Sequence, residues 1–281
     1  MASKDSDAPS SREVKEMRRK VREGPKCGTP VPNKWMRQVT KKARDAQDKT
    51  LLKNNRIVSA TIKVKFIHIT DGTDGKITQD MRQKQIKELN DSFGSHNIKF
   101  SYNEEQVVEK KNANWFNMGY GSAAERQAKR KLHADPKKYL NFYTANLEDD
   151  LLGWATFPWE LGGHPDMDGV VILYSTLPGG GAAPYDEGAT GTHEIGHWLG
   201  LYHTFQDGCP PSEGDEVADT QPHRAPDYDC DSNTACGSGS SPVENFMNYT
   251  EDACMTKFTK GQAVRAKEMI TIYRNQLFRS K

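Results

Sequence analysis

The chain has 281 residues, 35% of them hydrophobic and 27% charged, which suits one large domain with an appended segment. No run approaches the roughly 18 consecutive apolar residues of a membrane-spanning helix, which excludes a helical integral membrane protein. The net charge of +1 conceals an asymmetry, because residues 1–50 carry 14 Lys and Arg against 7 Asp and Glu, whereas residues 51–281 carry 25 against 31.

Residues 1–50 form a polar, basic lead-in. Residues 11–22 are expected as an exposed helix, and the Gly and Pro residues between positions 24 and 32 are expected to break whatever follows. The lead-in shows no apolar segment of the secretory-signal kind. A nucleic-acid partner is disfavoured, because Trp35 is the lead-in's one aromatic side chain and the rest of the chain is acidic. The oligomeric state is left open.

The body of the chain, residues 51–281, mixes strands and helices and predicts an α+β fold. Apolar residues alternate with Lys and Thr from 57 to 69, which indicates a half-buried strand, whereas 169–174 is almost continuously apolar and should be buried on both faces. Thr78 is expected to cap a helix. The full expectation is strands at 57–69, 98–102, 140–144, 152–158 and 169–174, and helices at 77–90, 123–132, 192–199 and 259–278.

Four cysteines lie in or just after a long segment, residues 204–245, that is rich in Asp, Gly, Pro and Ser. Such a segment buries little and is better held by cross-links than by packing, so disulfides and an oxidising, extracellular setting are expected. Sequence alone allows three pairings, and a second zinc site is disfavoured because no Cys-x-x-Cys spacing occurs. These cysteines are Cys209, Cys230, Cys236 and Cys254.

A metal-binding pattern occupies residues 193–203, HEIGHWLGLYH. His193 and His197 are four residues apart, so on a helix both imidazoles project from one face towards a single ion. A third ligand on the same helix would lie too far along the axis. Gly200 permits a sharp turn, after which His203 can return as the third ligand.

Three neutral imidazoles would leave zinc its double charge and an open position for water, whose pKa the metal lowers. Glu194 follows the first histidine and can take the proton of that water as a general base. The pattern therefore predicts zinc-dependent peptide hydrolysis. Two rivals remain: a zinc-bearing binding module, which would not need Glu194, and an inhibitor or toxin-like protein acting through its basic arm.

Several further runs extend the pattern, and together they resemble the pappalysin family of metzincin zinc endopeptidases. The resemblance implies an upper subdomain of about 51–203, with a twisted mixed five-stranded sheet and two long helices above a cleft. It also implies an irregular, disulfide-linked lower subdomain of about 204–281 that ends in a helix. The runs are LLGWATFP, DGVVILY, GTHEIGHWLGLYHTF, GDEVADT, NFMNY and DACMTKFTKGQ.

The resemblance also implies roles for single residues. Met247 would form a soft hydrophobic floor beneath the histidines without binding zinc. Tyr249 would stabilise the oxyanion, and a merely buried tyrosine is an equal alternative. An extended protein or peptide substrate would pair with the cleft-edge strand, at Gly153, Trp154, Ala155 and Thr156.

The family pattern pairs the first cysteine with the third and the second with the fourth, giving Cys209–Cys236 and Cys230–Cys254. Cys27 in the lead-in is left over. Its thiolate would occupy the open zinc position in a latent zymogen, with residues 1–50 as a pro-segment. The rival is a free or intermolecularly paired thiol.

Structural calcium is a further expectation, because relatives bind it near the stretch that follows the zinc segment. Oxygen-rich irregular loops suit calcium, although a solvated acidic loop fits equally well. The acidic side chains are Glu213, Asp215, Glu216 and Asp219.

Overall fold

The computed structural model describes residues 26–46 and 60–278, and a mixed sheet is its centre. Five strands follow one path in the order β2-β1-β5-β7-β6, in which β6 at the edge is antiparallel to β7 and the other pairs are parallel. Two short strands extend it, β3 beside β1 and β4 beside β5. The bounds are β1 Ala60–Thr70, β2 Ile98–Tyr102, β3 Val108–Lys111, β4 Asn117–Met118, β5 Leu140–Leu147, β6 Gly153–Ala155 and β7 Val170–Leu173.

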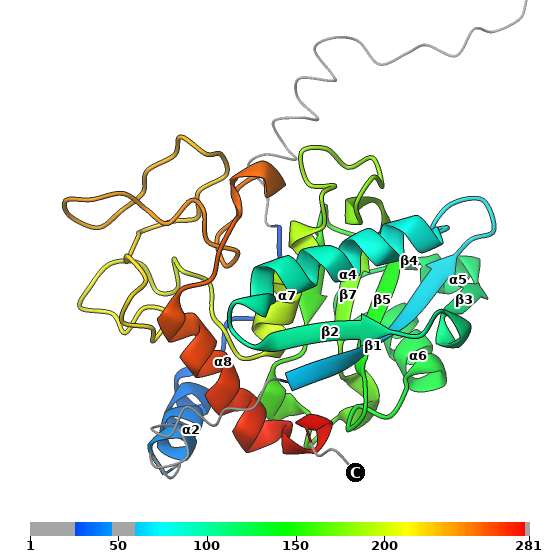
Figure 1. Cartoon of the computed structure of the whole chain (residues 1–281), viewed down its shortest axis with the longest axis horizontal. Coiled ribbons are helices and arrows are strands. Elements are labelled where there is room, and N and C mark those ends of the chain that lie inside the picture. Colours follow the sequence, from blue (N-terminus) through cyan, green and yellow to red (C-terminus); the bar gives the residue numbers. More distant parts are fainter. Residues whose placement is uncertain (1–25, 47–59, 279–281) are drawn as a thin grey trace, which may run out of the picture.

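Helices cover both faces of the sheet (Figure 1). On one face lie α4 (Gln79–Gly94) and α7 (Ala189–Trp198), and on the other lie α5 (Ala113–Phe116) and α6 (Ala123–Leu132). The alternation of side chains along β1 explains the arrangement, because even-numbered apolar residues from Ile62 join the first core and odd-numbered ones from Ile67 join the second.

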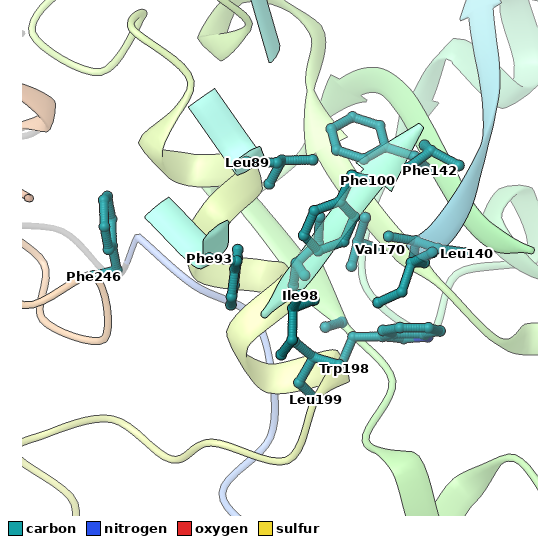
Figure 2. Packing of buried hydrophobic residues seen from close by; sticks show 14 of the residues in the cluster. Leu89, Phe93, Ile98, Phe100, Leu140, Phe142, Val170, Trp198, Leu199 and Phe246 are labelled. Atoms are coloured by element: carbon teal, nitrogen blue, oxygen red, sulfur yellow. The ribbon is translucent and has the colours of Figure 1, made fainter. Parts of the chain in front are cut away.

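Aromatic and branched side chains fill the first core between the sheet, α4 and α7 (Figure 2). Phe93 of α4 contacts Phe100 of β2 with ring centroids 5.4 Å apart, and Trp198 at the end of α7 is fully buried. This packing fixes α7 against the sheet, which matters because α7 carries the predicted metal ligands.

Most of the elements expected from periodicity are present. β2 and α6 have the expected bounds, Thr78 caps α4, and β5 and α4 run past their expected ends. The expected strand 152–158 is wrong beyond Ala155, because Pro158, which has no backbone N–H, begins a 3-10 helix. The expected helix 11–22 and the start of the first strand at 57 lie outside the described residues.

The last helix, α8, spans Lys260–Tyr273 and is shorter than expected. Arg274 leaves the helix and donates two hydrogen bonds to Asp168, at 2.7 and 3.1 Å, in the fully buried base of the sheet. The short 3-10 helices are η1 Glu104–Gln106, η2 Pro158–Glu160, η3 Pro165–Met167, η4 Tyr174–Thr176, η5 Asp252–Cys254 and η6 Asn275–Phe278.

A helix that the sequence reasoning did not anticipate, α2 (Lys34–Asp45), lies beside α8 (Figure 1). The prolines at 30 and 32 do not break it, because they precede its N-cap. Asn33 is that cap and accepts a hydrogen bond from the Met36 N–H at 2.8 Å. No helix within 26–46 or 60–278 has the length and apolar character needed to cross a membrane.

Candidate active site

The three predicted metal ligands converge at the end of α7. His193 and His197 lie one helical turn apart, and Gly200, with φ of +90°, turns the chain so that His203 comes back beside them. The Nε2 atom of His197 lies 3.1 Å from that of His193 and 3.0 Å from that of His203. All three side chains are buried.

The hydrogen bonds of the Nδ1 atoms decide which nitrogen of each ring carries the proton. Nδ1 of His193 lies 2.6 Å from the Phe246 carbonyl and Nδ1 of His197 lies 2.8 Å from the Leu201 carbonyl. A carbonyl only accepts, so both Nδ1 atoms donate and both Nε2 atoms present lone pairs. Burial lowers the pKa of His193 to about 4, which keeps the ring neutral. Neutral imidazoles whose lone pairs face one another at 3.1 Å suit a shared divalent cation such as zinc.

Glu194 lies beside this cluster and is 1% exposed. Its Oε2 atom accepts a hydrogen bond from the Thr29 hydroxyl at 3.0 Å and a longer one from the Cys27 thiol at 3.5 Å. Burial raises the pKa of Glu194 to about 8, and these two hydrogen bonds act in the opposite direction. The Cys27 Sγ atom, which contacts Glu194, lies within 4.8 Å of the imidazole nitrogens, so the Glu194 carboxyl borders the same point as the imidazoles.

Cys27 completes a group of four potential ligands with the histidines. The ligand atoms of all four lie within 4.8 Å of one another, and within the described ranges no other such group of His, Cys, Asp and Glu is found. Burial and then the neighbouring Glu194 raise the pKa of the thiol. Only a strong positive charge close by would hold it as a thiolate, which is the form that binds metals.

The segment 26–29 runs along the edge strand β6. Gly28 N–H donates to the Gly153 carbonyl at 2.8 Å, and Leu152 N–H donates to the Lys26 carbonyl at 2.9 Å. Ala155 N–H donates to the Thr29 hydroxyl at 2.9 Å. The two segments are parallel, and the lead-in thus takes the backbone positions expected to pair with substrate.

Two residues of the expected substrate strand have special surroundings. A Cβ on Gly153 would come within 2.9 Å of the Glu194 Cγ, so only glycine leaves room for that side chain. The Trp154 side chain points to the opposite face of the sheet, where its indole N–H donates to Glu125 at 2.7 Å. The Trp154 ring therefore packs in the second core, and the backbone groups that bond to residues 26–29 are those of Leu152, Gly153 and Ala155.

Beneath the histidines lies the turn that contains Met247, which is fully buried. Tyr249 follows it, with its ring centroid 5.0 Å from that of His203 and 5.7 Å from that of His193. Burial raises the pKa of Tyr249 well above its usual value, and the backbone of Cys27 beside its hydroxyl lowers that pKa in part. The lead-in thus engages Tyr249 as well as Glu194.

Comparison with known proteins decides the family. The family model for pregnancy-associated plasma protein-A, peptidase M43, matches residues 123–271. An extracellular metalloprotease of Neurospora crassa is 36% identical over 261 residues, which is 89% of this chain and 88% of that protein. The chain belongs to the pappalysin family and is a metalloendopeptidase.

Other relatives of this pappalysin extend the similarity. Extracellular metalloprotease 1 of Coccidioides posadasii is 37% identical over 70% of each chain. A promirolysin mutant from Tannerella forsythia superposes with a TM-score of 0.71 and 27% identity, covering 90% of this chain and 97% of that one. Mature mirolysin in complex with a cleaved peptide gives a TM-score of 0.63 and 28% identity, covering 79% and 99%.

The four cysteines between residues 204 and 254 pair as the family resemblance implied, Cys209 with Cys236 and Cys230 with Cys254. The four acidic side chains expected to attract calcium bond to different protein partners. Glu213 pairs with Lys41, Asp215 accepts from Thr220, Glu216 pairs with three arginines, and Asp219 accepts from Thr259.

Sequence reasoning missed one residue that contacts the site, Thr29, and one that packs on a neighbour of the site, Arg37. Thr29 bonds to both Glu194 and the β6 backbone, and its place two residues after Cys27 was the one local signal. Arg37 packs over the ring of Tyr202, the neighbour of His203, at 5.2 Å from the ring centroid. Nothing local marks Arg37, because its partners lie far away in the chain.

Proposed function

We propose that this pappalysin is a zinc-dependent endopeptidase, with zinc held by His193, His197 and His203. Glu194 would be its general base and Tyr249 its oxyanion partner. The observation that carries the proposal is the convergence of three imidazole Nε2 atoms, at 3.0 and 3.1 Å, beside the buried Glu194. A zinc-bearing binding module would need the imidazoles but no carboxylate there.

When bound, zinc supplies Lewis acidity to the attacking water and to the scissile carbonyl. Glu194 takes a proton from the water and passes it to the leaving amine. The Tyr249 hydroxyl donates to the carbonyl oxygen as negative charge develops on it. The backbone of β6 pairs with an extended protein or peptide substrate, which aligns the bond and accepts many sequences.

The described form is the latent one in this proposal. Residues 26–29 engage Glu194, Tyr249 and the β6 backbone together, so a substrate cannot reach any of them. The Cys27 thiolate would be the fourth zinc ligand, and residues 1–50 would be the pro-segment. The larger share of this chain covered by promirolysin, 90% against 79% for mature mirolysin, supports this reading.

An extracellular location fits the two disulfides and the names of the curated relatives, which are extracellular metalloproteases. Calcium stays a prediction from the family resemblance.

The test is Glu194→Ala, assayed on casein after the lead-in has been cut off. Loss of activity by about a thousandfold, with zinc retained, is expected because only proton transfer is removed. His164→Ala, at an exposed histidine, is the matched control and should keep full activity. Wild-type activity should vanish with o-phenanthroline and return with zinc. A Glu194→Ala variant as active as wild type would refute the general base, and folded wild type without stoichiometric metal would refute the zinc site.

A further inference from the structure

Helix α2 of the lead-in docks with its polar side inward. The buried residues of the helix are Arg37 and Thr40, whereas Trp35 and Val39 are 65% and 39% exposed. Apolar burial, the usual reason for a helix to pack, is therefore a small part of this contact. What holds α2 on the molecule must be sought in its arginines.

Arg37 lies in a socket in which each side of its guanidinium has a partner. Nε donates to Glu216 at 3.0 Å, one Nη donates to Asp207, and the other donates to the Gly214 carbonyl at 2.7 Å. The guanidinium carbon lies over the ring of Tyr202, 5.2 Å from the ring centroid. The arginine is 8% exposed. A guanidinium group that donates hydrogen bonds to several partners and also lies over an aromatic ring makes strong and specific contacts.

Arg44, two turns further along α2, adds a second charged contact. Its Nε atom lies 2.5 Å from Glu268 of α8, and its Nη1 atom lies 3.7 Å from Glu216. Glu216 also pairs with Arg265 of α8 at 2.8 Å, so one carboxylate joins two arginines of α2 to the body of the enzyme. Burial alone would raise the pKa of Glu216, but the arginines outweigh it and lower that pKa.

These contacts are separate from those in the cleft. Residues 26–29 bind β6 and Glu194, whereas Arg37 and Arg44 bind Asp207, Glu216 and Glu268 of the lower region and α8. Two contacts on one short chain reinforce each other, because the first to form holds the second at high local concentration.

We propose that the arginine socket, meaning the contacts of Arg37 and Arg44 with Asp207, Glu216 and Glu268, is an independent anchor. It keeps residues 26–46 bound after the chain between residues 46 and 60 has been cut. The partner that fits this surface is the arginine-bearing helix of the same polypeptide. The proposal rests on the proposed function in one respect, that the retained segment covers a protease cleft. Cleavage of the connection is then insufficient for activation, and the segment must also dissociate.

Salt should control that dissociation. Arg44 and Asp207 have 21% and 37% of their side-chain surface exposed, so ions can reach both ends of the socket. Attraction between partly exposed charges falls steeply between about 0.05 and 0.5 M salt.

The experiment uses the full chain, loaded with zinc, with a specific protease site placed within residues 47–59. After the cut, size-exclusion chromatography and mass spectrometry measure how much of the N-terminal fragment stays with the body. In wild type the fragment should co-elute at about 0.05 M NaCl and leave at about 0.5 M. In R37A/R44A, retention at low salt should fall by about tenfold or more.

The matched control is K41A/K42A, which removes the same charge from the same helix at two exposed lysines. It should retain the fragment as wild type does, because exposed pairs such as Lys41–Glu213 contribute little. Loss of the wild-type fragment at low salt, or equal retention in R37A/R44A, would overturn the anchor. The salt series with the wild-type α2 helix needs no substitution in α2 and so does not depend on the folding of an arginine variant.

Casein hydrolysis, measured on the same fractions, separates the anchor from the proposed function. Retention alone decides the anchor, whatever the activity. If fragment-free protein hydrolyses nothing, the protease assignment fails while the anchor stands. If fragment-bound protein is fully active, the covering of the cleft fails while the anchor again stands.

Discussion

Gly196 of α7 lies directly against Met247, and a Cβ on the glycine would overlap the methionine sulfur. The backbone of α7 therefore packs directly against the Met247 thioether. The same turn orients two of the proposed ligands, because Phe246 accepts from His193 and the Met247 carbonyl accepts from the N–H of Thr204, next to His203, at 3.2 Å. The turn that contains Met247 thus helps to position the histidine cluster.

Gly196→Ala should lower the free energy of unfolding by about 1–3 kcal/mol, because the core at this point has no space for a methyl group. Urea denaturation measures this. Met247→Ala, which removes the clashing sulfur, should cost less stability in the Gly196→Ala background than in wild type. Gly162→Ala, where an added Cβ meets nothing within 4 Å, is the control and should change stability by less than about 0.5 kcal/mol. Strict additivity of the first two substitutions would argue against the contact.

Cys27→Ala should raise the activity of the uncut chain on a quenched fluorescent peptide by about tenfold or more, because the proposed fourth ligand is lost. The four other cysteines form the two disulfides, so a thiol assay on unfolded, unreduced protein checks that one thiol has been removed. Unchanged latency in this variant would show that the rest of the lead-in suffices.

Thr29→Val removes the hydroxyl that Glu194 and Ala155 share while keeping the shape of the side chain. Two hydrogen bonds between the lead-in and the cleft are lost, and each contributes about 1 kcal/mol, or more with a charged partner. The uncut chain should therefore show several-fold higher activity than wild type. Equal activities would mean that these bonds do not hold the segment.

Removal of metal should lower the melting temperature by roughly 5 °C or more, because a cation that binds only the folded state stabilises it. Zinc should restore it, and a His203→Ala variant should show a smaller shift on chelation. Differential scanning calorimetry with and without o-phenanthroline measures this. Identical melting curves would contradict a bound metal.

Asp227 gives a prediction about acid stability. Burial alone would raise its pKa, but hydrogen bonds from His223, Asn248 and Ser241 outweigh burial and lower the pKa to about 2, from 3.8. A carboxyl with a lowered pKa stabilises the fold above pH 3.8, and this stabilisation is lost as the pH falls towards 2. The stabilisation by the ionised Asp227 carboxyl is about 2 kcal/mol.

Wild type and Asp227→Asn should therefore differ most near neutral pH, and urea unfolding should find the difference shrinking by about 2 kcal/mol as the pH approaches 2. A difference that stays constant over this range would contradict the lowered pKa.

Much of the candidate site could be predicted from local sequence. The spacing of His193, His197 and His203 around Gly200 specifies a helix, a turn and a return, and these depend on neighbouring residues only. The strands followed from periodicity because burial on one or both faces leaves a mark in each segment. The disulfide pairing was different, since three pairings were open and only the family resemblance chose between them.

Helix α2 escaped prediction for a physical reason. Its exposed Trp35 and Val39 reverse the usual pattern, and the arginines that hold it have partners distant in sequence, such as Arg37 and Glu216, 179 positions apart. The pairing of residues 26–29 with β6 is equally remote, with 165 positions between Thr29 and Glu194. No local propensity encodes such contacts.

The sequence by itself predicted the chemistry that we propose for this protein, because three imidazoles and a carboxylate within eleven residues form a metal-site pattern. Only the tertiary structure decided how that chemistry is covered. Hydrogen bonds along an edge strand and charged contacts on a distant helix form only when the chain has folded and brought both partners together.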